Sequence, residues 1–540
     1  MPLNNASLCE FTPVNEEELE RILSKSPTKS CSLDPLPTWM LKQLTKPLLP
    51  LMTKIINMSL STGQVPSSMK EARITPLLKK SSLDPDNLKN HRSVSNLPFL
   101  YKILEKVVAS RLKHYMDVNQ LYDPMQSAYR SGHSTETALT KVLNDMLVTM
   151  DNQGVAILVM LDLSAAFDTV DHKVLLQRMK DIIGVNGLVL KWFESYLSER
   201  TQRIQINDKL SKLICLIFGV PQGSVLGPLL FLIYMLPLHH LILSHGLKMH
   251  GYADDTQLYL SFTNPTNPDA VQHGCEVIER CLMDIHSWMT ENKLKLNSNK
   301  TEIILFGTRV ALSRIKLESL NVAGTRILLA SGTVKNLGVE CDATLTMESQ
   351  VNKVVKAANL QIRNIGNVRR KLDMNSTKIL VHSLVISRLD YGNSLLCGIS
   401  NKLLARLQSV QNKAARLIKL TRKYEHITPV LMELHWLPIS VRAEFKLMLL
   451  VYKALNGLAP QYIRGMLYVH QPVRNLRSSS MELLKVPKSR LKTIGDRAFS
   501  IHAPRIWNNL PAYIRQSDSV TKFKSQMKTY YYTMTYSHLM

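Results

Sequence analysis

Residues 155–163 read VAILVMLDL, a continuous apolar run of the length of one β-strand. A run of this kind is typical of a strand that is buried on both faces. Asp162 stands near its end, where an ionised carboxylate is costly to bury without a partner. The stretch therefore predicts a core strand that carries an acidic group to a place where something neutralises its charge.

Residues 247–262, LKMHGYADDTQLYLSF, are typical of two strands joined by a tight acidic turn. Asp254 and Asp255 occupy that turn, and adjacent carboxylates repel each other unless a cation neutralises them. Hard divalent ions such as Mg²⁺ take oxygen ligands of this sort, and two ions about 3.5–4 Å apart stabilise the attacking and leaving oxygens at a phosphate. The alternative is that Asp162 caps a turn and the two aspartates form an ordinary hairpin turn. On spacing alone this structural alternative is favoured, because such turns are common.

The composition describes a large globular chain with an uneven charge. Its 540 residues are 45% hydrophobic and 20% charged, which excludes a collagen, a disordered tail and a disulfide-stapled secreted module. Seven cysteines, none in a CxxC pair, favour a reducing compartment and argue against a structural zinc site.

Residues 351–540 carry 31 basic and 8 acidic side chains, a net charge of +23, whereas residues 1–350 carry +2. This concentration of charge indicates a polyanionic partner, most simply nucleic acid.

Hydrophobic periodicity predicts a mixed α/β part followed by a helical part. Helical patterns occupy 15–62, 96–118 and 172–185, and strand patterns occupy 72–79, 301–306 and 335–341. We expect an Asn or a Ser to cap the helix over 96–118. After about residue 346 the strand patterns stop and long helical patterns take over.

The clearest of these helices is predicted over 402–420, KLLARLQSVQNKAARLIKL. Helical spacing places six apolar residues on one face: Leu403, Leu407, Val410, Ala414, Leu417 and Ile418. A basic stripe lies beside that face, formed by Lys402, Arg406, Lys413 and Arg416. For a single helix, a solvated outer face would explain the stripe. Within a region of net charge +23, a surface that follows nucleic-acid phosphates is at least as good an explanation.

The sequence gives no sign of a membrane or secreted location. The N-terminus is acidic and lacks the apolar run of a signal peptide. The most apolar stretch, 213–243, is interrupted at 221–224 and at 227–228, so no window reaches the roughly 20 apolar residues of a spanning helix. We therefore expect a soluble intracellular protein without a membrane partner.

Short blocks along the chain are similar, in the same order, to those of a known family. They are ITPLLKK (74–80), HRSVSNLPFLYKILEKVVASRL (91–112), QSAYRSGHSTETAL (126–139), LDLSAAFDTVDH (161–172), GVPQGSVLGPLLF (219–231), HGYADDTQLYL (250–260), LKLNSNKTEIILFG (294–307), VKNLGVECD (334–342) and a tail block at 477–511. Together they resemble the reverse transcriptases of non-LTR (LINE-type) retrotransposons, particularly the chicken-repeat and jockey-like branches. Each block alone is a weak signal, but their ordered sum is strong. The resemblance covers about residues 10–535. It favours a metal-binding role for Asp162, Asp254 and Asp255 over the structural alternative given above.

The resemblance implies an α+β, right-hand polymerase fold. Its parts would be an N-terminal helical extension (1–59), fingers (60–150), a palm with an antiparallel sheet (151–345), a helical thumb (346–470) and a basic helical C-terminal extension (471–540). The implied activity is RNA-directed DNA polymerisation, in which dNTPs are added to a primer 3′-OH by two metal ions. The implied partners are an RNA template, a DNA primer and dNTPs.

The resemblance also assigns the catalytic roles. Asp162, Asp254 and Asp255 would be the metal ligands, with the carbonyl of Leu163 as a further oxygen. The ion would be Mg²⁺, with Mn²⁺ as the alternative. Lys300 would be a catalytic cation near the leaving pyrophosphate.

The remaining roles concern the nucleotide and the primer. Lys79 and Arg92 would clamp the triphosphate of the incoming nucleotide. Phe167 would exclude a 2′-hydroxyl, while Gln222 and Gly223 would lie over the incoming base and the template. The primer grip would be formed by Leu337, Gly338 and Val339.

Two departures from the family pattern bear on activity. His91-Arg92-Ser93 stands where the family has Tyr, Arg and Pro, and losing the proline relaxes the local backbone and is expected to blunt closure of the fingers. Full elements carry an endonuclease before the polymerase, and the first 60 residues have no acid/His set of that kind. We therefore expect a partial element that depends on a separate endonuclease, in a nuclear location implied by the family.

Two alternatives to a working reverse transcriptase remain open. The chain could be an inactive relic of a retroelement that only binds nucleic acid, although its acidic residues are intact. An RNA-dependent RNA polymerase shares the same palm chemistry, but Phe167 and Ala253 argue against it, because such enzymes leave room for the 2′-hydroxyl and commonly use Gly-Asp-Asp. The oligomeric state cannot be inferred from the sequence.

Overall fold

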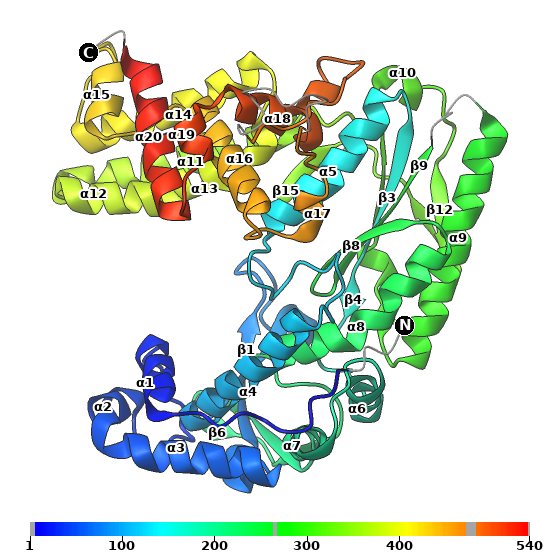
Figure 1. The fold of residues 1–540 in the computed structure, drawn as a ribbon, viewed down its shortest axis with the longest axis vertical. Coiled ribbons are helices and arrows are strands. Elements are labelled where there is room, and N and C mark those ends of the chain that lie inside the picture. The colour runs from blue at the N-terminus through cyan, green and yellow to red at the C-terminus, as the bar shows by residue number, and fades with distance from the viewer. Residues whose placement is uncertain (1–5, 263–266, 471–481, 538–540) are drawn as a thin grey trace. The chain divides into compact units, whose positions relative to one another are not determined.

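The computed structural model describes residues 6–262, 267–470 and 482–537 (Figure 1). The chain folds into two compact units, each built from three segments. Unit 1 contains residues 1–129, 162–244 and 281–297, and unit 2 contains residues 130–161, 245–280 and 298–540. Both helices and sheets occur in each unit, so the α+β class is confirmed. The linear domain boundaries predicted above are not the boundaries of these units, and they stay a prediction.

Unit 1 combines a helical N-terminal part with a five-stranded sheet. Its helices are α1 (Glu16–Lys25), α2 (Thr38–Gln43), α3 (Thr45–Thr62), α4 (Phe99–Val118), α6 (His172–Asp181), α7 (Gly187–Leu197) and α8 (Gly227–Ser244). Its strands are β1 (Glu71–Leu78), β2 (His91–Asn96), β4 (Leu163–Ser164), β5 (Arg200–Ile206), β6 (Lys209–Leu210), β7 (Ile214–Leu216) and β10 (Lys295–Leu296).

The sheet of unit 1 runs in the order β2-β1-β5-β6, and β7 also pairs with β5. Strands β1 and β2 are antiparallel, with Leu77 opposite Arg92, whereas β1 and β5 are parallel. The short strands β4 and β10 form a separate antiparallel pair, in which Leu163 lies opposite Leu296.

Unit 2 contains the central sheet and the C-terminal helices. Its strands are β3 (Val155–Leu161), β8 (Lys248–Tyr252), β9 (Asp255–Phe262), β11 (Glu302–Phe306), β12 (Ser319–Val322), β13 (Thr325–Leu328), β14 (Thr333–Asn336) and β15 (Val339–Asp342). Its helices are α5 (Thr135–Asp151), α10 (Arg309–Leu312), α11 (Glu348–Val368), α12 (Met374–Val381), α13 (Ser387–Asp390), α14 (Asn401–Lys419), α15 (Thr428–Glu433), α16 (Ile439–Leu455), α17 (Gln461–Arg464), α18 (Phe499–Asn509), α19 (Ala512–Arg515) and α20 (Val520–Tyr536). Helix α9 (Pro268–Glu291) begins in unit 2 and ends in unit 1.

The central sheet of unit 2 is antiparallel throughout and runs β11-β3-β9-β8. Every residue of β3 except Met160 is buried, which confirms the core strand predicted from the apolar run. Helix α5 packs against this sheet (Figure 1), and its start is fixed by a capping box between Ser134 and Thr137. Apolar side chains from α5, β3 and β11, among them Leu143, Leu158 and Ile304, belong to one buried cluster that continues into α11 and α14.

Three sequence predictions need correction. The predicted helix over 96–118 is α4, which begins at Phe99 after Pro98 and has no side-chain cap. Asn96 cannot cap it because this residue continues the β2 ladder opposite Arg73. The strand predicted at 335–341 is a hairpin of β14 and β15. The helix predicted at 172–185 already ends at Asp181.

Helix α8 is long and apolar enough to cross a membrane, the only one of the described helices that meets this test. It has 18 residues, and 67% of that stretch is buried inside the structure, as in the core helix of a globular protein. Gly227-Pro228 begins this helix and does not interrupt it, because a proline in the first turn has no hydrogen bond to lose. The sequence prediction treated this pair wrongly as a break.

Candidate active site

Two of the predicted catalytic carboxylates belong to neighbouring strand ends. In the antiparallel pair of β3 and β9, Leu161 lies opposite Thr256. Asp162 directly follows Leu161, and Asp255 directly precedes Thr256, so both belong to the same end of this strand pair. The side chain of Asp162 is half-buried and that of Asp255 is exposed.

Asp254 lies in the two-residue turn between β8 and β9, which closes with Tyr252 opposite Asp255. The other turn residue, Ala253, has a φ of +60°, a left-handed conformation that costs a non-glycine residue about 1–2 kcal/mol. Asp254 is half-buried. The predicted hairpin is therefore confirmed, but only Asp254 lies in its turn, because Asp255 is the first residue of β9. The backbone is strained at Ala253, next to the Asp254 carboxylate.

A partner of Asp162 was not predicted from the sequence. The backbone N–H of Asn297 donates to the carbonyl of Asp162 at 2.9 Å, and its side-chain amide donates to the carboxylate at 3.2 Å. Asn297 directly follows β10, which pairs with β4 beyond Asp162. The two hydrogen bonds from Asn297 therefore orient both the main chain and the carboxylate of Asp162.

Asp162, Asp254 and Asp255 offer carboxylate oxygens, which are the ligands that hard divalent cations prefer. Over the described ranges, however, no group of three or more His, Cys, Asp or Glu side chains is close enough together to hold a metal ion. The assignment of Asp162, Leu163, Asp254 and Asp255 as metal ligands stays a prediction.

Lys79 and Arg92 lie at the same end of the β1–β2 pair. The N–H of Lys79 donates to the carbonyl of Asn90 at 2.8 Å, and Arg92 lies opposite Leu77. Lys79 directly follows β1, so both residues belong to the end of the strand pair where Leu78 lies opposite His91. Both are exposed, and the ammonium of Lys79 donates to the carbonyl of Lys89 at 2.7 Å.

The loop that carries Gln222 and Gly223 is fastened to β2. The N–H of Ser95 donates to the carbonyl of Gln222 at 2.7 Å. Gly223 has a φ of +109°, and a Cβ there would lie 3.0 Å from the carbonyl oxygen of Ser95. Only glycine accommodates both the backbone angle and this close approach without strain.

Asp168 holds the side chain of Gln222. The amide nitrogen of Gln222 donates to both carboxylate oxygens of Asp168, each at 2.9 Å. Partial burial raises the pKa of Asp168, and the hydrogen bonds from Gln222 oppose this shift. The main chain of Asp168 also lies against the start of this loop. A Cβ on Gly219 would lie 2.8 Å from the carbonyl oxygen of Asp168.

Phe167 packs against α8. Its ring stacks on Phe231 with centroids 4.8 Å apart, and its side chain is half-buried. One face of the ring is thus supported by the core of unit 1. A bulky side chain held in this way can act as a rigid steric block.

A buried glutamate anchors the far end of the same loop. Glu105 on α4 is fully buried and accepts hydrogen bonds from the N–H of Val225 at 2.9 Å and from the hydroxyl of Tyr196 at 2.7 Å. Burial raises the pKa of Glu105, and the Val225 N–H opposes this shift. No sequence pattern pointed to this anchor, because a glutamate in an amphipathic helix is usually solvated.

In unit 2, the predicted primer grip is the tip of the β14–β15 hairpin. Leu337 and Gly338 have φ angles of +42° and +90°. The hydroxyl of Tyr391 donates to the carbonyl of Leu337 at 2.6 Å, and a Cβ on Gly338 would lie 3.1 Å from that hydroxyl. A buried amide pair, Asn336 to Gln257 at 2.8 Å, joins the hairpin to β9. The tip is therefore held in a defined conformation.

The other predicted cations lie on the surface of unit 2. Lys300 is exposed and ends a single helical turn over Ser298–Lys300. On α14, Lys402 and Lys413 are exposed and Arg406 is half-buried, while the apolar face is buried as predicted except for the half-buried Leu417. Two of the four cations have hydrogen-bond partners within unit 2. The guanidinium of Arg416 donates to the carbonyls of Arg422 and Glu425, and the ammonium of Lys413 donates to the side-chain oxygen of Asn359 at 3.3 Å.

Comparisons with known proteins agree with the sequence resemblance. Residues 78–341 match the family model described as reverse transcriptase (RNA-dependent DNA polymerase). The RNA-directed DNA polymerase from the mobile element jockey of Drosophila melanogaster is 26% identical over 418 residues, which cover 76% of this chain and 44% of that protein. Two probable RNA-directed DNA polymerases of the same organism are also similar. The one from transposon BS is 26% identical over 419 residues, which cover 75% of this chain and 44% of that protein. The one from transposon X-element is 24% identical over 429 residues, which cover 77% of this chain and 44% of that protein. The chain thus spans less than half the length of these relatives.

Proposed function

We propose that the chain is an RNA-directed DNA polymerase, because residues 78–341 match the family model described as reverse transcriptase (RNA-dependent DNA polymerase). It would extend the 3′-OH of a DNA primer with dNTPs, copying an RNA template, as in target-primed retrotransposition. The observation that carries the proposal is the register of β3 and β9, in which Asp162 and Asp255 belong to the same strand end.

Asp162, Asp254 and Asp255 would hold two Mg²⁺ ions, for which Mn²⁺ is the alternative, with the carbonyl of Leu163 as a further oxygen ligand. Bound there, the ions would supply charge stabilisation for the attacking and leaving oxygens of the phosphoryl transfer. The protein's own contribution is to orient the ligands: Asn297 fixes one oxygen of Asp162, and the two-residue turn fixes Asp254. Lys300 would donate a proton to the departing pyrophosphate.

The incoming nucleotide would bind to groups of unit 1. Lys79 and Arg92, at the same end of the β1–β2 pair, would contact its triphosphate. Gln222, held by Asp168, and Gly223, fastened to Ser95, would contact the base and the template strand. Gln222 and Gly223 are held before substrate arrives, so little of the binding energy is spent on ordering them.

Phe167 would select the sugar. Its ring is supported by Phe231, so it cannot easily move aside for a 2′-hydroxyl. We expect Phe167→Ala to raise the incorporation of NTPs relative to dNTPs, measured as the ratio of their kcat/KM values. An unchanged ratio would contradict this role.

The primer strand would contact the β14–β15 hairpin at Leu337, Gly338 and Val339. Duplex phosphates would follow three cations of α14: Lys402, Arg406 and Lys413. We extend the proposal to a nuclear location and to a separate endonuclease that supplies the primer end.

A second candidate function is a nucleic-acid-binding relic that no longer polymerises. The observation that favours it is Ser93, which lies opposite Pro76 in the β1–β2 pair at the position where the family has proline. Both candidates predict binding, so catalysis separates them.

The test is extension of a labelled DNA primer on an RNA template with Mg²⁺ and either dNTPs or NTPs. Extension with dNTPs supports the proposed polymerase. Extension with NTPs alone would indicate an RNA polymerase, and template binding without extension would indicate the relic.

A further inference from the structure

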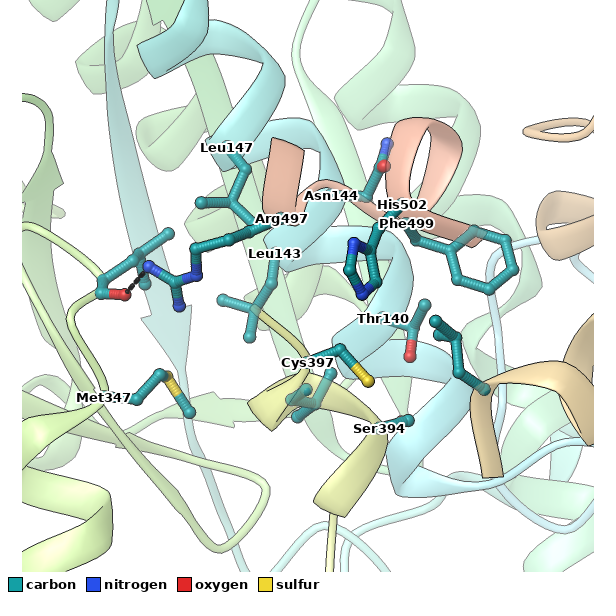
Figure 2. Close-up of a pocket in the computed structure, with 13 residues that line it drawn as sticks. Thr140, Leu143, Asn144, Leu147, Met347, Ser394, Cys397, Arg497, Phe499 and His502 are labelled. Carbon is teal, nitrogen blue, oxygen red and sulfur yellow. Dashed lines mark hydrogen bonds between the residues drawn. The ribbon is translucent and has the colours of Figure 1, made fainter. Parts of the chain in front are cut away.

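The C-terminal segment 484–515 returns to two elements near the catalytic sheet of unit 2. It contacts α5, which precedes β3, and the turn after β15. Figure 2 shows Arg497, Phe499 and His502 of this segment facing Leu143, Asn144 and Leu147 of α5 around a small pocket. The contacts below are specific enough to give the segment a role.

The first contact is made by Asp151, the last residue of α5. Its carboxylate, 4% exposed, accepts hydrogen bonds from the N–H of Arg490 at 3.0 and 3.1 Å and from the N–H of Leu491 at 2.7 Å. Gly495 lies so close that a Cβ there would be 2.2 Å from the same carboxylate. The chain is therefore wrapped around a buried negative charge.

The second contact starts a helix. Helix α18 begins after Ala498, which has no side chain that could cap it. The side-chain oxygen of Asn144 on α5 accepts the N–H of Ser500 at 2.9 Å and satisfies one of the open donors at this helix start. Helix α5 thus caps a helix whose Ser500 lies 356 residues further along the chain.

The third contact is made by Arg497 with the turn after β15. Its guanidinium donates to the carbonyl of Leu345 at 2.6 Å (Figure 2). Leu345 and Met347 have φ angles of +51° and +64°, a conformation that non-glycine residues keep only when the surroundings enforce it.

The same turn is wound around Asp342, the last residue of β15. Its carboxylate accepts the N–H groups of Thr346 and Met347, each at 2.9 Å. Arg497 and Asp342 thus both form hydrogen bonds with the strained turn. The turn adjoins the base of the hairpin, because it directly follows β15, which pairs with β14 along its whole length.

Arg497 also supports the segment that holds the hairpin tip. Its side-chain stem lies against Gly398, where a Cβ would be 2.9 Å from Cγ of Arg497. Tyr391, which precedes Gly398 in the same segment, donates to the carbonyl of Leu337 at the tip. Arg497 therefore contacts both the base of the hairpin and the segment that carries the residue holding its tip.

We propose that Arg497 is a positioning residue for the primer strand: through Leu345 and the 391–398 segment it fixes the β14–β15 hairpin in the conformation that binds the primer. The C-terminal segment then serves polymerisation through its contacts within unit 2, in addition to any contribution of its charge. The inference rests on the proposed function, which gives the hairpin its role as primer grip.

The experiment compares primer extension by the full chain, its Arg497→Met variant and its Arg497→Lys variant. Arg497→Met keeps the stem and loses the donor, and we expect about a tenfold rise in the KM for primer–template, because a hydrogen bond from a charged group contributes at least that much. The KM for dTTP stays at the wild-type value. Arg497→Lys, which keeps a cationic donor, recovers most of the loss.

The matched control is Arg505→Met. Arg505 lies in the same segment and pairs with Asp496 at 3.0 Å, but no described hydrogen bond or ion pair joins it to the hairpin or the turn. Its variant keeps the wild-type KM for primer–template. Equal increases in the two variants would overturn the proposal, because they would show an effect of lost charge alone.

Hydrogen–deuterium exchange of the free protein gives a second readout that does not need activity. Arg497→Met accelerates exchange at amides 337–347 and leaves β8 and β9 unchanged. Unaltered exchange together with an unaltered primer–template KM would overturn the inference while leaving the proposed function intact. If the wild-type chain does not extend primers, the proposed function fails, and the exchange result alone decides whether Arg497 positions the hairpin.

Discussion

Asp151 provides the sharpest test of how the C-terminal segment is held. Changing Asp151 to Ala removes a carboxylate that accepts hydrogen bonds from the N–H groups of Arg490 and Leu491. Those two residues are 339 and 340 positions further along the chain. The substitution thus removes a long-range tie without touching any proposed catalytic group.

The expected loss follows from the two N–H groups left without an acceptor. Each unsatisfied buried donor costs about 1–3 kcal/mol. Arg490 is exposed, so water can reach its amide and the lower end of that range applies to it. We expect a total of about 2–4 kcal/mol, which corresponds to roughly 30- to 900-fold faster local opening.

Native-state hydrogen exchange measures this quantity directly, because the two units need not unfold as one cooperative transition. Amides of 490–509 in Asp151→Ala should exchange faster by that factor, and Asp151→Asn, which keeps one acceptor oxygen, should lie between the two. The neighbouring Asn152→Ala serves as the control, because Asn152 is exposed and its side chain bonds locally to Val148. Exchange in Asp151→Ala within about twofold of wild type would show that the carboxylate does not hold the segment.

Three further predictions concern separate parts of the chain. Gly219→Ala should destabilise unit 1 by about 2 kcal/mol or more in urea unfolding, because φ is +81° and the added Cβ would meet Asp168; unchanged stability would contradict this. Burial, followed by the charge of Arg505, lowers the pKa of His502, so the unfolded chain takes up a proton more readily than the folded one. The stability contributed by neutral His502 is therefore complete above the usual histidine pKa of 6.5 and falls as the pH drops below that value. His502→Gln should therefore flatten the fall in melting temperature between about pH 8 and pH 5.5. Replacing three cations of the α14 stripe with Gln should reduce the slope of log Kd for duplex against log salt by about one unit for each phosphate that the helix no longer neutralises, whereas an identical slope would exclude the stripe from the interface. The residues changed together are Lys402, Arg406 and Lys413.

Local patterns in the sequence predicted the central strands and the acidic hairpin. The apolar run of β3 and the acidic hairpin depend on neighbouring residues, and the structure confirms both, although the turn itself is Ala253-Asp254 and Asp255 already belongs to β9. Helix α14 was predicted for the same reason, since its buried face repeats at helical spacing. The family blocks extended these local signals to an ordered set of site residues.

Interactions between distant segments could not be predicted in this way. Asn297 meets Asp162 because β10 pairs with β4, and no pattern in the sequence specifies this short pair. Leu337 adopts a left-handed conformation without being glycine, so the turn inside 335–341 carried no signal at that residue. Arg497 looked like one more charge in a basic tail, although its role depends on a carbonyl 152 residues away.

The carboxylates at the end of β3 and in the turn before β9 are the groups to which we assign polymerisation. The decisive measurement is primer extension on poly(rA)/oligo(dT) with Mg²⁺ and dTTP, for wild type, Asp254→Asn and the exposed-surface control Asp208→Asn, with template affinity measured in parallel. We expect that Asp254→Asn abolishes extension, that Asp208→Asn extends like wild type, and that all three bind template equally well. Extension by Asp254→Asn at the wild-type rate would contradict the assignment of the active site.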